Sequence, residues 1–185
     1  MKTFRLTSFA SVLCLAACSQ NEQPPVHVTA YKPVATVQDI MQSIVDPAAD
    51  SLWESVETTV IAKGTEEKQP RTDEEWKTVR HHAITLVESA NVLVIPGRHV
   101  VHTSKSLEDA HVAGINKAED IQKLIDDNPE AFESYAVALR AAGEQALAAI
   151  DARDVPALVN AGGTIDAACE QCHLHYWYPN TFRPN

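Results

Sequence analysis

Hydrophobic residues recur at helical spacing in four stretches of the chain. The clearest stretch lies between Thr72 and Pro96-Gly97. Its apolar residues are three and four positions apart: Trp76, Val79, Ala83, Leu86, Ala90 and Leu93. Residues at this spacing lie on one face of a helix. Because Glu75 follows Thr72 by three residues, which is the pattern of a capping box, we predict an amphipathic helix that begins there.

A second stretch begins at Thr36, where Asp39 completes another capping box. Its apolar positions are Met41, Ile44 or Val45, Ala48, Leu52 and Val56. Pro47 lies inside this stretch. A proline within a helix removes a hydrogen bond and clashes with the preceding turn, so we expect a bend or a local break there. We expect the segment to close at Lys63-Gly64.

Two further stretches follow in the C-terminal half. Asn128-Pro129 places an N-cap residue before a proline at the first helical position, which favours a helix start. The apolar positions are Phe132, Tyr135, Leu139, Ala142, Ala146 and Ile150, and then Leu158, Ala161, Ile165, Ala168, Cys172 and Tyr176. Residues 151–154 separate them as a turn. No stretch shows sustained strand alternation, so we predict an all-α fold, a four-helix bundle.

The segment between the second and third predicted helices is an insertion. Residues 98–127 are weakly patterned, and a structureless loop of that length is uncommon in a compact domain. We therefore expect short helices near Ser106–Val112 and Lys117–Ile125.

The first residues of the chain have the features of an export signal. Lys2 and Arg5 precede a mostly apolar stretch, Leu6–Ala17, that is too short to span a bilayer. Leu15-Ala16-Ala17-Cys18 resembles the lipobox of bacterial lipoproteins, in which the cysteine is lipidated and becomes the mature N-terminus. The resemblance implies a signal peptide over residues 1–17 and a lipid anchor on Cys18.

Ser19, the residue directly after Cys18, indicates which membrane the lipid would be anchored in. An aspartate after the lipidated cysteine is the usual signal for retention at the inner membrane, whereas this chain has Ser19. We therefore expect a lipid-anchored protein on the periplasmic side of a bacterial membrane, the outer membrane by this resemblance, with the lipid as its only membrane contact. Residues 18–35 are polar and carry no apolar period, so we predict a flexible tether.

The net charge limits the classes of partner, and the positions of the cysteines limit the possible disulfides. The 185-residue chain has 15 Lys and Arg against 25 Asp and Glu, a formal net charge of −10 at pH 7. Nucleic-acid binding needs a basic patch, so we exclude nucleic acid as a partner. Four cysteines would allow two disulfides in an exported protein. Cys14 and Cys18, however, belong to the predicted signal and lipobox.

The last two cysteines form a motif with a histidine. Cys169-Glu-Gln-Cys172-His173 reads CxxCH, and cysteines at i and i+3 lie on one face of the predicted fourth helix. Two thiols at that separation can add to the vinyl groups of a haem, and the next residue is placed to bind the iron. We expect one covalent haem c on Cys169 and Cys172, with His173 as axial ligand.

Three other uses of this motif are weighed against haem. A dithiol redox site usually opens a helix that follows a strand, and no strand is predicted. A zinc site would draw on Cys169, Cys172, His173 and His175, which close a tetrahedron poorly from a single turn. A disulfide between the two cysteines would be strained within a helix.

A four-helix bundle with CxxCH in its last helix resembles the cytochrome c′ superfamily. The resemblance covers Thr36–Trp177, and we place the haem domain at residues 36–185. It includes Gly162-Gly163 before the motif and Tyr176 three residues beyond it. It implies a haem between the helices, frequent homodimers, and either electron transfer or binding of small gases. Many members carry Arg or Lys four residues after the ligand histidine, where this chain has Trp177.

Two glycines inside a helix are costly, at about 1 kcal/mol each relative to alanine. A close approach of a neighbouring helix or of the haem to Gly162-Gly163 would explain why they are tolerated.

The sixth ligand of the iron separates the functional hypotheses. In low-spin members of the superfamily a methionine from the first helix fills that place. Met41 is the one methionine outside the predicted signal, although a helix methionine usually packs in the core. If the Ala62-Lys63-Gly64 turn matches the family's first turn, the residue over the iron falls near Ala48. A small apolar residue there would leave the iron five-coordinate.

The remaining polar candidates are weaker. The histidines of the second helix and of the insertion are expected at the surface: His81, His82, His99, His102 and His111. Arg98 is a candidate contact for a haem propionate, because arginine pairs well with carboxylates. As a cation at a helix C-terminus it would equally stabilise the helix.

We therefore predict a c-type cytochrome that acts in periplasmic electron transfer and is not an enzyme. Its acidic surface favours a redox partner with a basic docking patch. Two alternatives remain open: a five-coordinate haem protein that binds nitric oxide or carbon monoxide, and a zinc-stabilised structural lipoprotein.

Overall fold

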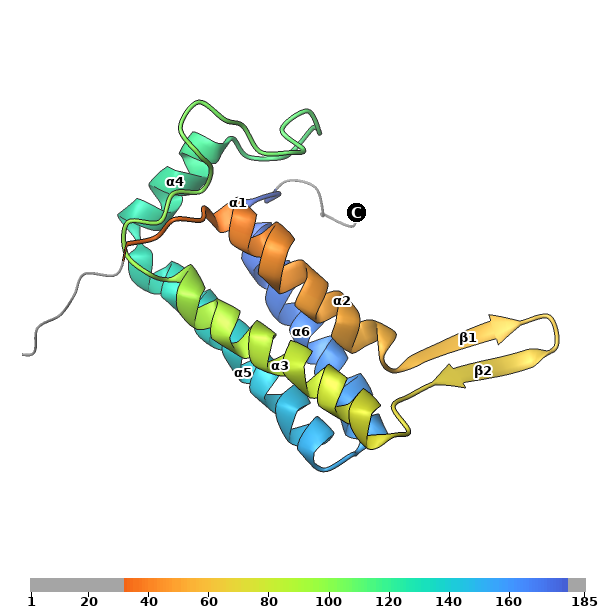
Figure 1. Cartoon of the computed structure of the whole chain (residues 1–185). Helices are drawn as coiled ribbons and strands as arrows, with labels where there is room; N and C mark the ends of the chain where they lie inside the picture. The colour runs from red at the N-terminus through yellow and green to blue at the C-terminus, as the bar shows by residue number, and fades with distance from the viewer. Residues whose placement is uncertain (1–31, 180–185) are drawn as a thin grey trace, which may run out of the picture. The chain divides into compact units, whose positions relative to one another are not determined.

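The computed structural model describes residues 32–179, which belong to one unit of the chain, Tyr31–Asn185. This part of the chain is mostly helical and contains one small two-stranded sheet (Figure 1). The predicted signal peptide, the lipidation site Cys18 and most of the predicted tether lie outside the described residues. None of the described helices is both long enough and apolar enough to cross a membrane.

The first helical region begins at the capping box predicted at Thr36. The Thr36 hydroxyl accepts a hydrogen bond from the Asp39 N–H at 3.1 Å, and the Asp39 carboxylate accepts one from the Thr36 N–H at 2.8 Å. These bonds satisfy backbone donors that a helix start leaves without partners. The prediction of this helix start is confirmed.

Helix α1 (Val37–Ile40) continues into a π-helical turn, η1 (Met41–Val45), and then into α2 (Asp46–Glu54). The π turn ends at Val45, two residues before Pro47. In a regular α-helix the proline ring would clash with the carbonyl four residues earlier, and the wider turn relieves that clash. The local break predicted near Pro47 is therefore confirmed as a π turn.

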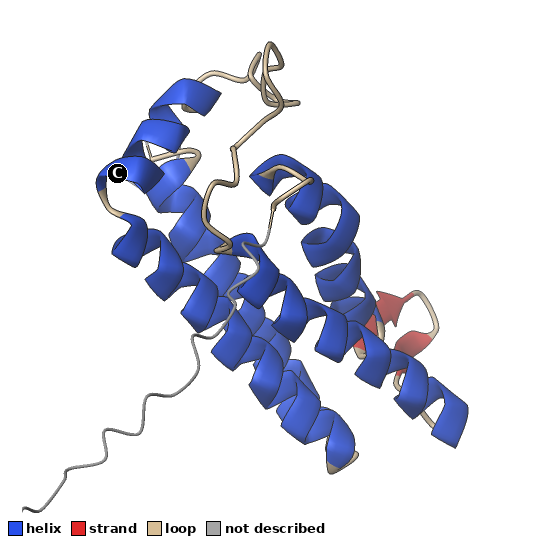
Figure 2. Cartoon of the chain, turned by 60° about the vertical axis from the view of Figure 1, so that its left-hand side comes forward, coloured by secondary structure: helices blue, strands red, loops and turns tan. Residues whose placement is uncertain are grey.

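The prediction that this helix extends to Lys63-Gly64, and that the chain has no strand, is wrong. Strands β1 (Glu57–Ile61) and β2 (Gly64–Lys68) form an antiparallel hairpin that projects from the ends of α2 and α3 (Figures 1 and 2). The run Thr58-Thr59-Val60-Ile61 is β-branched, which favours a strand over a helix. Gly64 takes a φ of +138°, which suits glycine after a two-residue turn.

The other three predicted helices are present. They are α3 (Asp73–Leu93), α5 (Pro129–Asp151) and α6 (Val155–Tyr176). Each starts at a side-chain cap: Thr72 and Glu75 form the predicted capping box, and Asn128 accepts from the Ala131 N–H at 3.2 Å. Asp154 accepts from the Ala157 N–H at 2.9 Å at the start of α6. The caps thus fix where the long helices begin.

The insertion contains one of its two predicted helices. Helix α4 (Ala118–Asp127) matches the helix predicted near Lys117–Ile125. The helix predicted near Ser106–Val112 is wrong, because that segment consists of turns. Leu107 is its one buried side chain, which is too little to form the apolar face of a helix.

The long helices pack around a shared core. Helix α5 contacts both α3 and α6, and α2 contacts α3 and α6. The largest fully buried side chains are Leu52, Leu86, Leu158, Ile165 and Val45. A Cβ atom on Gly143 of α5 would lie 2.9 Å from Cγ2 of Val87 on α3, so glycine allows these two helices to approach closely.

Candidate functional site

The CxxCH motif lies in the last two turns of α6. Cys169 and Cys172 are free thiols and both are partly buried, so no disulfide joins them. They are three residues apart and share a face of the helix. His173 follows directly and is also partly buried. The backbone thus brings two thiols and an imidazole to one end of α6.

Two cavities adjoin this end of α6. The first has a volume of about 250 Å³ and is lined by Cys169 as well as Cys172. The second has a volume of about 220 Å³ and lies under residues of the insertion. Five residues line both cavities: Met41, Asp46, Phe132, Cys172 and His173. The two cavities are therefore neighbouring compartments around the motif.

The walls of the first cavity are mainly apolar. Val45 and Ala49 come from the first helical region, and Phe132 and Leu139 come from α5. The cavity therefore lies between the first helical region, α5 and the end of α6. Apolar walls with a few placed polar groups are typical of cofactor sites.

Burial raises the pKa of both thiols. The pKa of Cys169 rises to about 11, because of burial and then the charges of Asp46 and Asp166. The pKa of Cys172 rises to about 12, because of burial and then the neighbouring Cys169. Both groups are protonated at neutral pH. Dithiol redox sites depend on a lowered thiol pKa, so these environments do not favour that alternative.

His173 is held neutral by its surroundings. Burial lowers its pKa, and the charges of Glu170 and Asp109 oppose this effect. The Trp177 ring lies edge-on to the imidazole, with the ring centroids 4.9 Å apart. The Trp177 N–H donates to the His173 carbonyl at 2.8 Å, which ends the helix. A neutral imidazole has the lone pair that a metal ligand needs.

Met41 is brought to the same site. It lies in the π turn η1, is partly buried, and lines both cavities together with His173. Ala48 is buried in the core and lines neither of these two cavities. The register that placed Ala48 over the iron assumed a helix running to Lys63-Gly64, whereas α2 ends at Glu54. Met41 is thus the sixth-ligand candidate that the structure brings near His173.

The other histidines lie away from the motif. Four are exposed and His82 is partly buried, and none of the five lines either cavity: His81, His82, His99, His102 and His111. Nε2 of His102 lies 2.9 Å from Oδ2 of Asp39 at the start of α1. Their predicted surface placement is confirmed for the four exposed histidines.

Arg98 is buried and donates hydrogen bonds to two backbone carbonyls. One NH group donates to the Ala35 carbonyl, and the other donates to the Val92 carbonyl at 2.8 Å. Val92 is in the last turn of α3, and its carbonyl also accepts from the Ile95 N–H at 3.2 Å, so the guanidinium adds a further bond at this helix end. Burial lowers the pKa of Arg98. Arg98 lines neither cavity beside the motif, and its contact with a propionate stays a prediction.

One of the two helix glycines has a clear packing role. Nε1 of Trp53, from α2, donates to the Gly162 carbonyl at 3.0 Å. A Cβ atom on Gly162 would lie 3.1 Å from Cδ1 of that indole, so a close approach of α2 accounts for this glycine as predicted. Gly163 has open space around its Cα, and the structure gives no packing reason for it.

Several residues of the insertion reach the site, and the sequence analysis missed them. Leu107 and Asp109 line the second cavity. Asn116 donates from its N–H to the Trp177 carbonyl at 2.7 Å, and from Nδ2 to the Tyr176 carbonyl at 2.8 Å. These are single residues in a segment without periodicity, so no local sequence pattern marks them.

The residues present fit a haem c. The motif offers two protonated thiols and one neutral imidazole beside apolar walls, and the Tyr176 hydroxyl and Trp177 Nε1 are buried there without a hydrogen-bond partner. Unpaired buried donors are costly, and a bound group with acceptor oxygens would satisfy them. Within residues 32–179, no three side chains of His, Cys, Asp or Glu are grouped to hold a metal ion.

Comparison with protein-family models, with curated proteins and with solved structures gives no match for this chain. The resemblance to the cytochrome c′ superfamily therefore rests on the CxxCH motif and on the order of the helices around it.

Proposed function

We propose that this protein is a c-type cytochrome that carries one covalent haem and transfers electrons in the periplasm. Cys169 and Cys172 would hold the haem through thioether bonds, and His173 would bind the iron as axial ligand. The observation that carries the proposal is that this CxxCH motif opens onto two adjoining cavities with apolar walls.

We also propose that the helical domain is a four-helix bundle of the cytochrome c′ type. The mutual packing of α2, α3, α5 and α6 supports this arrangement, as does the position of CxxCH at the end of the last helix. The hairpin is then an addition between the first and second long helices. The insertion is an addition between the second and third.

The bound haem would supply the reversible one-electron chemistry of iron. The chain itself would provide a covalent attachment, a neutral imidazole and walls that exclude water. Met41 would be the sixth ligand, because it shares both cavities with His173. Two axial ligands favour electron transfer over gas binding, which needs an open position on the iron.

The charges around the site support a basic partner. Carboxylates line the two cavities: Asp46, Glu108, Asp109, Asp166 and Glu170. Among the residues described, no lysine or arginine lines either cavity. A partner with a basic patch would be attracted to this end of the helices, and its association would weaken with salt. The lipid anchor on Cys18 would keep the protein on the periplasmic side of the outer membrane.

Covalent haem is the first test. We would express the full chain in a host with the c-haem maturation machinery and stain a denaturing gel for haem. The wild-type band should stain, and the double variant Cys169→Ser, Cys172→Ser should not. A wild-type band without haem would contradict the proposal and leave the zinc-stabilised lipoprotein as the alternative.

The visible spectrum then tests the axial ligands. The ferric protein should be low-spin. Met41→Ala should convert the ferric protein to high-spin, and the reduced, ferrous form of this variant should bind carbon monoxide readily. His173→Ala should abolish this low-spin spectrum, because it removes the proposed axial ligand. His175→Ala is the matched control and should leave the spectrum unchanged, because His175 is an exposed histidine of the same turn. A wild-type protein that is already high-spin would favour gas binding instead.

A further inference from the structure

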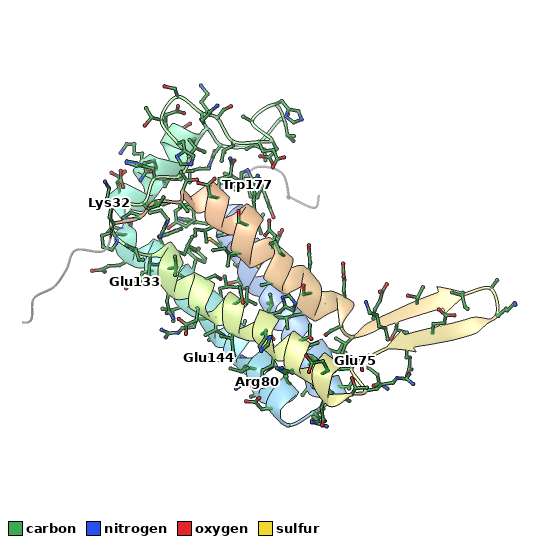
Figure 3. The ribbon with its side chains drawn as sticks, viewed as in Figure 1. Lys32, Glu75, Arg80, Glu133, Glu144 and Trp177 are labelled. Atoms are coloured by element: carbon green, nitrogen blue, oxygen red, sulfur yellow. The ribbon has the colours of Figure 1, made fainter. Side chains whose placement is uncertain are left out.

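The segment of residues 98–117 covers the second cavity, next to His173. It runs between α3 and α4 at the end of the helices where Trp177 is labelled in Figure 3. Its residues Val100, Leu107 and Asp109 line that cavity together with His173. A part of the chain that lacks regular structure therefore forms one wall of the proposed haem site.

This covering segment is fixed on both sides of Asp109. Before it, the Glu108 N–H donates to Oε1 of Gln38 on α1 at 3.0 Å, and Nε2 of Gln42 donates to the Glu108 carboxylate. After it, Asn116 donates two hydrogen bonds to carbonyls in the turn that ends α6. The position of Asp109 relative to His173 is thus set by bonds to two different helical regions.

The carboxylate of Asp109 differs from the other acids near His173. Its Oδ1 atom is buried and accepts no hydrogen bond from the residues described. Glu170 accepts from the Tyr178 hydroxyl at 2.6 Å, and Glu108 is exposed and already bonded to Gln42. An unpaired buried acceptor is costly, so Asp109 is available for a further hydrogen-bond donor.

We infer that Asp109 is a positioning residue that accepts the free ring N–H of His173 when the other ring nitrogen binds the haem iron. The inference rests on the proposed function. A metal-bound histidine almost always donates its second N–H to a carboxylate or a carbonyl, which fixes the ring and raises its basicity. Asp109 lines the same cavity as His173, and its charge already acts on the imidazole.

A hydrogen bond from the His173 ring to Asp109 would change the reduction potential of the haem iron. A carboxylate on the ligand imidazole increases its donation to iron, which stabilises the ferric state over the ferrous state. The site would therefore serve a low-potential electron carrier. Asp109→Asn should raise the reduced-to-oxidised ratio at a fixed potential about tenfold, which is about 59 mV for a one-electron couple.

The test compares two neighbouring carboxylates of the same segment in the full-length, haem-loaded chain. Asp109→Asn and Glu108→Gln remove the same charge one residue apart, and both side chains line the second cavity. The readouts are the reduction potential and the iron–histidine stretching band after carbon monoxide is released by light from the ferrous protein. Only Asp109→Asn should raise the reduction potential, so that the reduced-to-oxidised ratio at a fixed potential rises about tenfold. Only this variant should also lower the iron–histidine stretching frequency. Asp109→Glu should restore part of both.

Each other outcome overturns the inference. Equal shifts in Asp109→Asn and Glu108→Gln would mean that only overall charge matters. A shift in Glu170→Gln without one in Asp109→Asn would make Glu170 the partner. If Asp109→Asn does not take up haem, Asp109→Glu is the variant to measure. The inference would be contradicted if its iron–histidine stretching band matched neither a histidine bonded to a carboxylate nor a histidine without such a partner. Wild-type protein without haem would overturn the proposed function as well, whereas haem with an insensitive Asp109 overturns only this inference.

Discussion

The hairpin of residues 57–68 and the covering segment of residues 98–117 are the two non-helical excursions between long helices, and they differ in what they contact. Every strand residue of the hairpin is exposed. The covering segment has no strand or helix, yet it is bonded to α1 and to the end of α6 and lines a cavity at His173. Regular secondary structure is thus a poor guide to which excursion belongs to the site.

The largest expected difference between the two regions is in core packing. Leu107 is 8% exposed and lines the second cavity, whereas Val60 in the hairpin is 83% exposed. Leu107→Ala should lower the free energy of unfolding by about 2 kcal/mol, because it leaves a void under the covering segment. Val60→Ala should change it by less than about 0.5 kcal/mol. Urea unfolding of the two variants measures both values, and equal effects would contradict the comparison.

The next effect is at Asn116, which connects the covering segment to α6. Asn116→Ala removes one side-chain hydrogen bond and should cost about 1 kcal/mol of the free energy of unfolding. It should also speed hydrogen exchange at the N–H groups of Trp177 and Tyr178, which donate to the His173 carbonyl. Asn160→Ala, an exposed asparagine at the other end of α6, is the matched control and should change neither. Unchanged exchange in Asn116→Ala would show that the segment does not hold this turn.

The hairpin should be dispensable. Replacing residues 57–68 by a short Gly-Ser linker should move the Tm by no more than about 2 °C, because an isolated two-stranded hairpin adds little stability. Haem attachment, followed by in-gel staining, should be unchanged. Loss of covalent haem in this variant would place the hairpin among the elements that build the site.

The smallest effect concerns pH. Hydrogen bonds from the Thr36 N–H and hydroxyl lower the pKa of Asp39, and His102 of the covering segment adds a smaller effect. A lowered folded-state pKa gives stability that is present above the ordinary aspartate pKa and is lost as the pH falls through the folded-state value. Asp39→Asn should therefore reduce stability at pH 6 and make it less dependent on acid below about pH 4. Urea midpoints at pH 3 and pH 6 measure this.

Glu67→Gln in the hairpin is the matched control for Asp39→Asn. It also removes one carboxylate, but one that caps no helix, so the difference between the two urea midpoints should be unchanged. An acid dependence equal to that of wild type in Asp39→Asn would contradict the role of the cap.

The sequence predicted the parts of this fold that depend on local rules. The helix starts at Thr36, Thr72 and Asn128 follow from side chains that cap backbone N–H groups within three residues. Pro47 predicted a bend or a local break, which in the structure is a π turn. The hairpin was missed because it buries no apolar face, and periodicity reports only buried faces.

The candidate site was predictable only in part, for a related reason. CxxCH is a local pattern, so the motif could be found, and Met41 stood out because the domain has no other methionine. Asp109 and Asn116 reach the site through contacts with residues that are distant in the sequence. A single sequence contains no signal for such contacts, and the fold is needed to reveal them.

Through the π turn, Pro47 influences how the preceding helical residues are rotated about the helix axis. An α-helix turns by about 100° per residue, and a π turn absorbs one extra residue. Residues on the N-terminal side of η1 are therefore rotated by about 100° relative to where an uninterrupted helix would present them. Met41, the first residue of η1, lines the first cavity together with Val45 and Ala49. Pro47, which lines neither cavity beside the motif, would thus influence which side chain of the first helical region faces the proposed haem.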